Sequence, residues 1–317
     1  MDSEINHSAG FQEALNTLEI DRKIISKNRK LSNIITGFAF ITVVIWLIIK
    51  FHILVFLGFF FVYGIIRSVI RIKIENDTQR YKVDYKTNVV IPALKNLKES
   101  LAFTPQSGIS DDEFISSELF ITKPDRYNTQ DLITGTADKT SFYFAEVHAE
   151  FKIESENKKR TKWFDIFKGI IFIADFNKNF STSTVVRPKS PKDEINSWFS
   201  KNIFSFGDSD KVQLENTEFD SKFVTYSKNQ IEARYILTPA MMERIVALNS
   251  KCDKTISISF IHSKMYIAFP LSHNYFEAPI HKTLLAPDLL TDDLSIVQFM
   301  QDIVHELDLN TRIWGKE

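Results

Sequence analysis

One long apolar stretch, residues 31–66, constrains this chain more than any other feature. It reads LSNIITGFAFITVVIWLIIKFHILVFLGFFFVYGII, and its one strongly charged residue is Lys50. A single helix of this length would measure about 54 Å, far more than the roughly 30 Å hydrocarbon core of a bilayer. The stretch is therefore too long for one membrane span and long enough for two short ones.

A break at residues 50–52 divides the stretch into two spans. The first, 31–49, has about the length that one crossing requires. The second, 53–66, is short and borrows apolar residues beyond its end, with Arg67 extending to the headgroups. We therefore predict a transmembrane helical hairpin over residues 31–70.

Two other interpretations of this stretch are weaker. A cleaved signal peptide would need a shorter apolar run and a small-residue cleavage site, and no second apolar segment would follow it at once. A buried hairpin of a soluble protein would keep a polar face on each helix, and here no face is polar.

The charged flanks of the hairpin predict its orientation. Basic residues gather on both sides, whereas the turn offers only Lys50. They are Arg22, Lys23, Lys27, Arg29 and Lys30 before the hairpin, and Arg67, Arg71, Lys73, Arg80 and Lys82 after it. The positive-inside rule then places both termini in the cytoplasm. The single cysteine, Cys252, agrees with a reducing compartment and excludes an internal disulfide.

The composition of the 317 residues excludes several function classes. The net charge of -1 provides no basic field for nucleic acid, and the nine glycines form neither a GxGxxG motif nor a P-loop. No Gly-x-Ser-x-Gly elbow marks a serine nucleophile. We therefore predict no catalytic residue, no metal site and no cofactor.

The polar parts of the chain predict an α+β domain. Residues 1–30 carry an amphipathic helix from 11 to 30, which we expect to pack on the cytoplasmic domain; an in-plane membrane helix is the alternative. The cytoplasmic domain, 71–317, comprises a long helix, a strand-rich core and a strand/helix part. Their ranges are 71–101, 131–187 and 211–314.

The spacing of apolar residues and the helix-capping residues predict the strands and helices within this domain. Ser110 opens a capping box before a short helix, and Thr238-Pro239 starts another, 240–248. Period-two segments predict these strands: 131–136, 141–153 with a bulge near Ala145-Glu146, 164–176 paired with 180–186, 212–215, 219–226, 233–237, and a hairpin of 255–261 with 264–269. A charged loop, 154–162, and a helix, 193–201, lie between them, and a last helix, 292–306, has an apolar face that must cover a sheet. The expected sheet is antiparallel with flanking helices.

Several of these segments resemble a bacterial family of two-pass membrane proteins described only as a domain of unknown function. The resemblance rests on the hairpin and on short motifs across nearly the whole chain. These are Gly108-Ile109-Ser110, Asp131 with Gly135, Phe144-Ala145-Glu146-Val147, Lys168-Gly169, Ala174-Asp175-Phe176-Asn177-Lys178, Ala233-Arg234-Tyr235-Ile236-Leu237-Thr238-Pro239 and Glu306-Leu307-Asp308-Leu309-Asn310-Thr311-Arg312-Ile313-Trp314. The resemblance implies a bacterial inner-membrane protein with a cytoplasmic C-terminal domain and a LemA-type membrane protein as partner. It brings no activity and no catalytic residues.

Two groups of residues are candidates for chemical sites. His262, His273 and His281 lie within twenty residues, but their spacing matches no metal motif, so we interpret them as ordinary histidines. Asp131, Glu146 and Asp175 lie on neighbouring predicted strands and could form an acid/base or cation site, although turn or ion-pair carboxylates are the simpler interpretation.

The end of the chain offers two further features. Asp308-Leu309-Asn310 lacks the acidic alternation and the glycine of a calcium loop. Trp314 follows the last amphipathic helix, and we predict that it packs on the sheet; the alternative is an anchor for a partner or the membrane interface.

The sequence as a whole predicts a membrane-anchored, cytoplasm-facing interaction or scaffold protein without an assigned biochemical activity. The alternative is a membrane-bound hydrolase that uses strand-borne carboxylates. A pore formed by the hairpin is least favoured, because nothing polar lines it. The expected partners are the lipid bilayer and another membrane protein, and nucleic acid is not expected.

Overall fold

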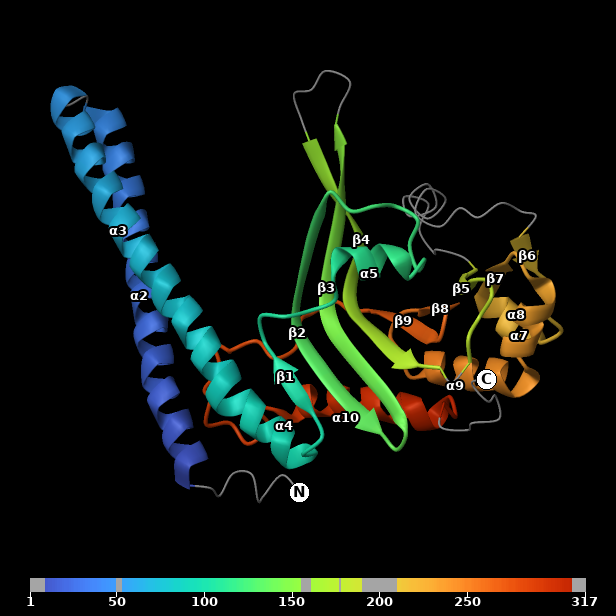
Figure 1. The fold of residues 1–317 in the computed structure, drawn as a ribbon. Coiled ribbons are helices and arrows are strands. Elements are labelled where there is room, and N and C mark those ends of the chain that lie inside the picture. The colour runs from blue at the N-terminus through green and yellow to red at the C-terminus, as the bar shows by residue number, and fades with distance from the viewer. Residues whose placement is uncertain (1–8, 50–52, 155–160, 177, 190–209, 310–317) are drawn as a thin grey trace. The chain divides into compact units, whose positions relative to one another are not determined.

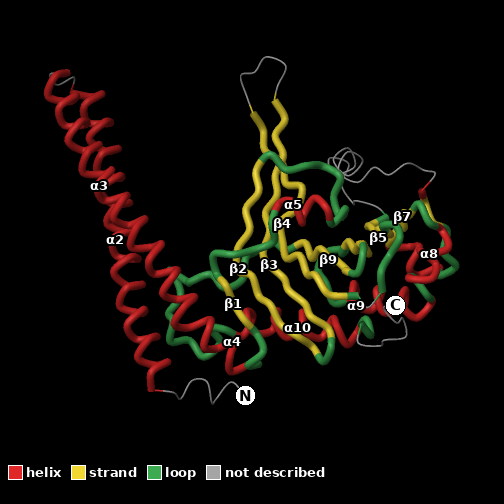
Figure 2. Tube along the Cα trace, viewed as in Figure 1, coloured by secondary structure: helices red, strands yellow, loops and turns green. Residues whose placement is uncertain are grey.

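The chain forms two compact units. The computed structural model (Figures 1 and 2) describes residues 9–49, 53–154, 161–176, 178–189 and 210–309. Unit 1 comprises Met1–Leu97 and Phe276–Asp292, and unit 2 comprises Lys98–Tyr275 and Asp293–Glu317. Segment 276–292 thus belongs with the helices of unit 1, although the chain on both sides of it belongs to unit 2.

Unit 1 is built on two long antiparallel helices, α2 (Ala9–Ile49) and α3 (Ile53–Tyr85), which lie side by side in Figure 1. The Trp46 and Phe56 rings stack with centroids 4.3 Å apart. Further along the pair, Arg67 of α3 donates a hydrogen bond to Thr36 of α2. The predicted helix 11–30 and the first apolar segment are one continuous helix, because neither a proline nor a turn signal separates them.

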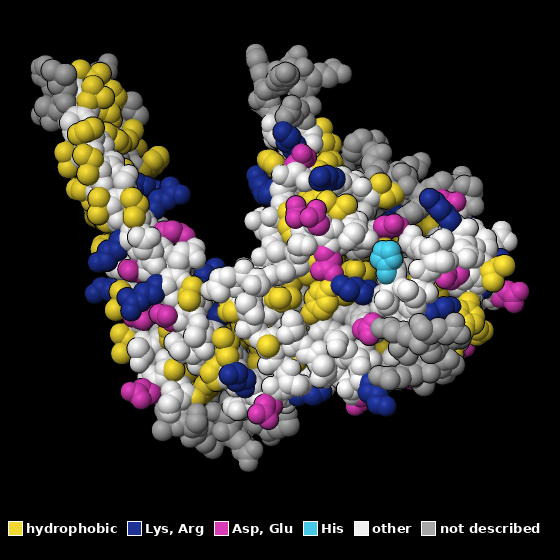
Figure 3. All heavy atoms as spheres, viewed as in Figure 1, with side chains coloured by type: hydrophobic (Ala, Val, Ile, Leu, Met, Phe, Trp, Pro, Cys, Tyr) yellow, Lys and Arg dark blue, Asp and Glu magenta, His cyan; other side chains and the backbone are white. Residues whose placement is uncertain are grey.

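Large apolar side chains cover the outside of this helix pair. Figure 3 shows them gathered toward one end of the two helices, with Lys and Arg side chains below them. Phe40 of α2 is 70% exposed and Phe61 of α3 is 71% exposed. Their exposed apolar neighbours are Ile34, Phe38, Ile41, Val44, Ile45, Ile53, Leu57, Phe59, Val62, Ile65, Ile66 and Val69.

The other end of the pair is packed and hydrogen-bonded. The predicted stripe of α2 is buried there, as shown by Phe11, Leu15, Leu18 and Ile25. At the end of α3 a five-residue π-helix (Lys86–Val90) leads into α4 (Ile91–Leu97). The predicted helix to residue 101 therefore ends four residues early. Pro92 is the second residue of α4, directly after the π-helix, so the departure from α-helical geometry lies next to the predicted proline break.

Unit 2 contains a nine-stranded sheet with the order β1-β2-β3-β4-β9-β8-β5-β7-β6. Each neighbouring pair of its strands is antiparallel. The strands are β1 (Ala102–Thr104), β2 (Arg126–Ala137), β3 (Thr140–Glu154), β4 (Thr161–Asp175), β5 (Thr184–Pro188), β6 (Lys211–Val212), β7 (Phe223–Ser227), β8 (Ser257–Ile261) and β9 (Lys264–Pro270). The mixture of helices with an antiparallel sheet confirms the α+β class.

Helices cover both faces of this sheet. On one face, Phe114 of α5 (Asp111–Ser116) stacks on Phe120 at 5.3 Å and belongs to a buried cluster with Val147 of β3. On the other face, Phe299 of α10 (Thr291–Glu306) meets Phe269 of β9 edge-on at 5.7 Å. The two faces are visible in Figure 1, where α10 passes behind the strands and α5 lies in front of them.

The predicted caps and the long elements are confirmed. The Ser110 side chain accepts the N–H of Glu113, and the Thr238 side chain accepts the N–H of Met241 at the start of α9 (Pro239–Ser250). Strands over 131–136 and 141–153, the 255–261/264–269 hairpin and the helix 292–306 correspond to β2, β3, β8 with β9, and α10.

The predicted bulge lies on the opposite strand. Gln130 pairs with Glu146 and Ile133 with Phe144, so Asp131 and Leu132 of β2 face Ala145 alone. Asp131 takes a positive φ of 60°, a conformation that aspartate tolerates better than most residues. Strand β3 itself keeps an unbroken register with β4 from Phe142 to Ala149. Its apolar residues change parity near Ala145-Glu146 because both faces of the strand are buried.

Four predicted strands were wrong in part or in whole. Of segment 212–215, only residue 212 is in a strand, β6. Segment 180–186 does not pair with 164–176, because β3 and β9 occupy both edges of β4, and β5 pairs with β7 and β8 instead. Residues 219–222 belong to α7 (Thr217–Lys222), and 233–237 fall mostly in α8 (Gln230–Ile236). Asparagine side chains at positions 216 and 229 cap these helices. Trp314, helix 193–201 and most of loop 154–162 lie outside the described residues.

Candidate functional site

The structure does not bring the three candidate carboxylates together. Asp131, in the bulge, follows Gln130, which pairs with Glu146, so these two acids lie at neighbouring positions. Glu146 pairs on its other side with Ile170 of β4, whereas Asp175 pairs with Lys264 at the end of that strand. Asp175 lies five positions after Ile170, about 17 Å along the strand. The three-carboxylate site is therefore wrong for Asp175.

Glu146 has structural partners. Its side chain accepts hydrogen bonds from the backbone N–H of Tyr275 and from Gln130 Nε2, the latter at 3.2 Å. These bonds tie the chain after β9 to strand β3, close to where the chain leaves unit 2. Glu146 therefore has a structural role.

Among the described residues, the three histidines, Cys252 and Asp308 belong to no group that could hold a metal ion. His262, His273 and His281 are exposed, and the described residues that could hold a metal ion together do not include them. Cys252 is partly buried, and burial raises the pKa of its thiol to about 11, the opposite of what a nucleophile needs. Asp308 forms an ion pair with Arg244 at 3.0 Å, and Asn310 lies outside the described residues.

A cluster that the sequence did not indicate joins β3 and β4. His148, Glu150 and Asp165 place ligand atoms within 4.8 Å of one another. His148 Nε2 lies 2.7 Å from Asp165 Oδ1, while Arg126 Nη1 approaches Glu150 Oε2 at 3.1 Å. Because Glu150 is already paired with Arg126 and Asp165 with His148, the cluster serves as a cross-strand polar network.

A second polar network fastens α5 to the sheet. Lys264 Nζ donates to Glu113 Oε1 at 2.9 Å and to the Tyr143 hydroxyl at 2.8 Å, and this hydroxyl also donates to Glu113. Burial raises the pKa of Tyr143 above its usual value, so the phenol stays protonated. All three groups are satisfied by one another, which is typical of a structural network.

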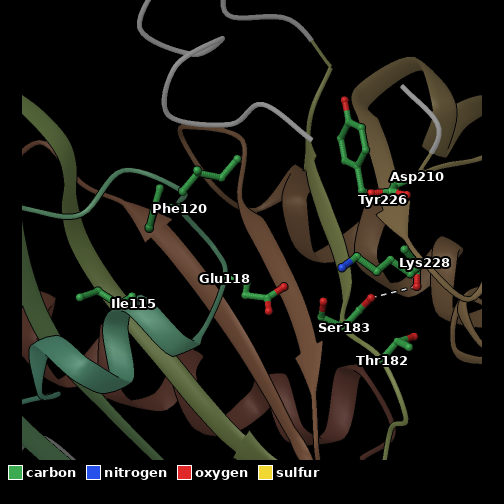
Figure 4. Close-up of a pocket in the computed structure, with 10 residues that line it drawn as sticks. Ile115, Glu118, Phe120, Thr182, Ser183, Asp210, Tyr226 and Lys228 are labelled. Atoms are coloured by element: carbon green, nitrogen blue, oxygen red, sulfur yellow. Dashed lines mark hydrogen bonds between the residues drawn. The ribbon is translucent and has the colours of Figure 1, made fainter. Parts of the chain in front are cut away.

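A concave pocket of about 580 Å³ lies in unit 2 (Figure 4). One wall comes from the chain after α5, and the other from β7 and the residues that precede β5. The lining residues are Ile115, Glu118, Phe120, Ile121, Thr182, Ser183, Asp210, Tyr226, Ser227 and Lys228. Its volume is within the range of small-molecule sites, which is about 300–1,000 Å³.

The wall after α5 is held in a strained conformation. Glu118 has a positive φ of 52°, which costs a non-glycine residue about 1 kcal/mol or more. Two side chains of the sheet hold it: Ser259 Oγ donates to the Ser117 carbonyl at 2.6 Å, and Arg187 Nη2 donates to the Glu118 carbonyl at 2.8 Å. Burial lowers the pKa of the Arg187 guanidinium to about 10, so it remains charged at neutral pH.

The opposite wall is fixed by a carboxylate and a serine. Glu232 accepts hydrogen bonds from the N–H and hydroxyl groups of Ser181 and Thr182, at 2.9–3.1 Å. These four donors hold the pKa of Glu232 below its ordinary value despite its partial burial. Ser227 Oγ donates to the Ser183 carbonyl at 2.9 Å, the bond drawn in Figure 4. No motif marks these residues, because they come from distant parts of the chain.

One helix of the described residues, over Gly10–Trp46, is long and apolar enough to cross a membrane by length and composition. Residues 165–309, slightly less than half of the chain, match a family described as "Protein of unknown function (DUF3137)". This agrees with the resemblance to a domain of unknown function.

Comparison with solved structures found the mycobacterial trehalose monomycolate transport factor A, TtfA. Its crystal structure aligns with 67% of this chain and 92% of its own, at 10% identity and a TM-score of 0.35. A search of curated proteins found no significant match.

Proposed function

We propose that this protein is a membrane-anchored scaffold whose two apolar helices cross the bacterial inner membrane as a hairpin. The supporting observation is the antiparallel pair α2/α3, whose large apolar side chains point outward along both helices. Soluble proteins rarely expose apolar patches larger than a few hundred Å². A hydrocarbon environment removes the cost of this surface, about 25 cal/mol for each Å² taken out of water.

The charges at the ends of the spans support the orientation. Arg67 of α3 hydrogen-bonds Thr36 of α2 and, at 2.9 Å, Tyr63, so a cation and two hydroxyls lie at one level of the pair. The long side chain of Arg67 can extend from this level toward the headgroups, as basic side chains do near the ends of spans. Lys27 and Arg71 continue the basic flank beyond it. We infer that both ends of the pair lie in the cytoplasm.

The scaffold role is favoured over hydrolysis because the polar groups of the sheet are used structurally. Glu146 bonds Tyr275 and Gln130, and Glu113 bonds Lys264 and Tyr143. A scaffold in the membrane needs a partner there, and we propose the LemA-type membrane protein that the family resemblance implies. A tagged full chain co-expressed with such a protein should retain it through detergent extraction, whereas recovery equal to that with an unrelated two-pass protein would contradict this partner.

The topology is tested by cysteine labelling in intact cells. Because the Cys252 thiol is partly buried, the experiment uses a Cys252→Ser background with single changes Ile5→Cys, His52→Cys or Lys254→Cys. A membrane-impermeant maleimide should label only position 52 in intact cells and all three positions after permeabilisation. Labelling of position 5 or 254 from outside would refute the hairpin.

A further inference from the structure

We propose that the pocket beside Phe120 in unit 2 binds a zwitterionic ligand that carries an apolar substituent. Glu118 would take the ammonium group of the ligand, and Lys228 would take its anionic group. The apolar substituent would lie against Ile115, Phe120 and Ile121. This proposal concerns unit 2 alone and goes beyond the scaffold role.

Two opposite charges face the interior of the pocket. Figure 4 shows the Glu118 carboxylate and the Lys228 ammonium directed into the pocket from opposite sides. Among the residues that the structure describes, neither of these two side chains forms an ion pair, although Glu118 also interacts electrostatically with the buried guanidinium of Arg187. Two separated opposite charges are complementary to a ligand that carries both signs, and each would make a charge-assisted hydrogen bond.

One wall of the pocket is apolar. Phe120 is nearly buried, with 6% exposure, and stacks on Phe114, so its position is fixed by the core. Ile121 next to it is 45% exposed. A pocket with one apolar wall and a few convergent polar groups is typical of small-molecule sites. The ligand therefore needs an apolar group beside its charges.

Both walls of the pocket are held in place by buried or hydrogen-bonded side chains. The strained backbone at Glu118 is held by the buried side chains of Ser259 and Arg187, at 0% and 2% exposure. Opposite it, Glu232 and Ser227 fix the chain at 182–183. Strain that the surrounding structure maintains is concentrated at binding and catalytic sites. Preorganised walls lower the ordering cost of binding.

Two sources supply this ligand chemistry, a free peptide with apolar side chains and an aminophospholipid headgroup. The experiment therefore uses trileucine and dihexanoyl phosphatidylethanolamine below its micellar concentration as probes. The full chain is placed in phosphatidylglycerol nanodiscs, so that no bilayer lipid carries an ammonium group. Calorimetry measures affinity for each probe and for its N-acetylated form; for trileucine, the C-terminal amide is also measured.

We expect at least one of the two probes to bind, and the one that binds identifies the source. N-acetylation should weaken the binding at least tenfold, and Glu118→Gln should abolish that penalty. For trileucine, amidation should weaken binding similarly, and Lys228→Met should abolish this second penalty; for the lipid, Lys228→Met should weaken binding at least tenfold. The control Glu243→Gln removes an exposed carboxylate of α9, outside the pocket, and should change nothing.

Three results would overturn the proposal. They are no binding of either probe at millimolar concentration, binding that is indifferent to blocking the charged ends, and penalties that persist unchanged in Glu118→Gln and Lys228→Met. Far-UV circular dichroism of each variant separates a lost fold from a lost contact. Both substitutions lie on exposed side chains, so we expect wild-type spectra.

Discussion

Glu19 allows the packing of unit 1 to be tested through its pH dependence. Its carboxylate, with a side chain only 6% exposed, pairs with Arg22 at 2.7 Å and accepts the backbone N–H of Leu284 at 3.0 Å. Arg22 in turn donates to the Ile280 carbonyl at 2.9 Å. These bonds fasten segment 276–292 to α2. The hydrogen bond and charge of Arg22 hold the pKa of Glu19 at about 2, below its ordinary 4.5.

This depressed pKa fixes both the sign and the size of the effect. The carboxylate stabilises the folded state fully above about pH 4.5, and the stabilisation is lost as pH falls toward 2. Because each tenfold change in an acid constant is worth about 1.4 kcal/mol, the shift corresponds to about 3 kcal/mol. Glu19→Gln should therefore lower the protection of the Leu284 amide by at least about 100-fold at pH 7.

Hydrogen exchange of the full chain in detergent measures this effect, with Glu13→Gln on the exposed side of the same helix as control. Protection factors correct for the intrinsic pH dependence of exchange. At pH 3 the folded state retains only part of the stabilisation, so the gap between wild type and Glu19→Gln should shrink to about tenfold. A gap that stays the same at both pH values, or no gap at pH 7, would refute the role assigned to Glu19.

Three further substitutions test unit 2, each by a denaturant melt of the full chain followed by circular dichroism. Gly169→Ala should cost about 2–4 kcal/mol, because its Cβ would lie 2.0 Å from the Phe269 carbonyl oxygen at a φ of +155°; a neutral result would contradict this close approach. Asn229→Ala should cost about 1 kcal/mol by removing the cap of α8, and Asn229→Asp should retain the stability. Ser259→Ala should cost about 1–2 kcal/mol by leaving the Ser117 carbonyl without its buried donor, and an unchanged melt would show that the wall after α5 is held otherwise.

Elements with local signals were predictable from the sequence. The caps at Ser110 and Thr238 need only a side chain and an N–H three residues later, so they could be identified without knowledge of the fold. The period of two over β3 and the apolar face of α10 extend over enough residues to distinguish strand from helix.

The errors arose where the local signal was short or the partner was distant. Helices α7 and α8 have six and seven residues, less than two turns, so a period of 3.6 could not develop. Their asparagine caps were the available signal. Besides β3, strand β4 pairs with β9, nearly a hundred residues later in the chain. No local pattern in the sequence specifies this second partner.

The pocket and segment 276–292 were missed for the same reason. The pocket walls come from residues 115–121, 182–183 and 226–228, and nothing in their local patterns indicates that they meet. Glu118 reads as an ordinary exposed acid until its positive φ is seen. The carboxylates Asp131, Glu146 and Asp175 were grouped by neighbouring strands, but register along the strands decides contact, and it separates Asp175.

Segment 276–292 makes the two apolar helices part of a folded unit. Because the chain leaves unit 2 after Tyr275 and returns at Asp293, the two units share three chain connections. Within unit 1, the Tyr81 hydroxyl donates to the Pro279 carbonyl at 2.7 Å, and Lys82 pairs with Glu277 at 2.9 Å. A truncation that removes α2 would deprive the buried Leu284 of the Glu19 carboxylate and expose the apolar side of the segment. The helix pair is therefore a folded unit with its own core, completed by a distant piece of the chain.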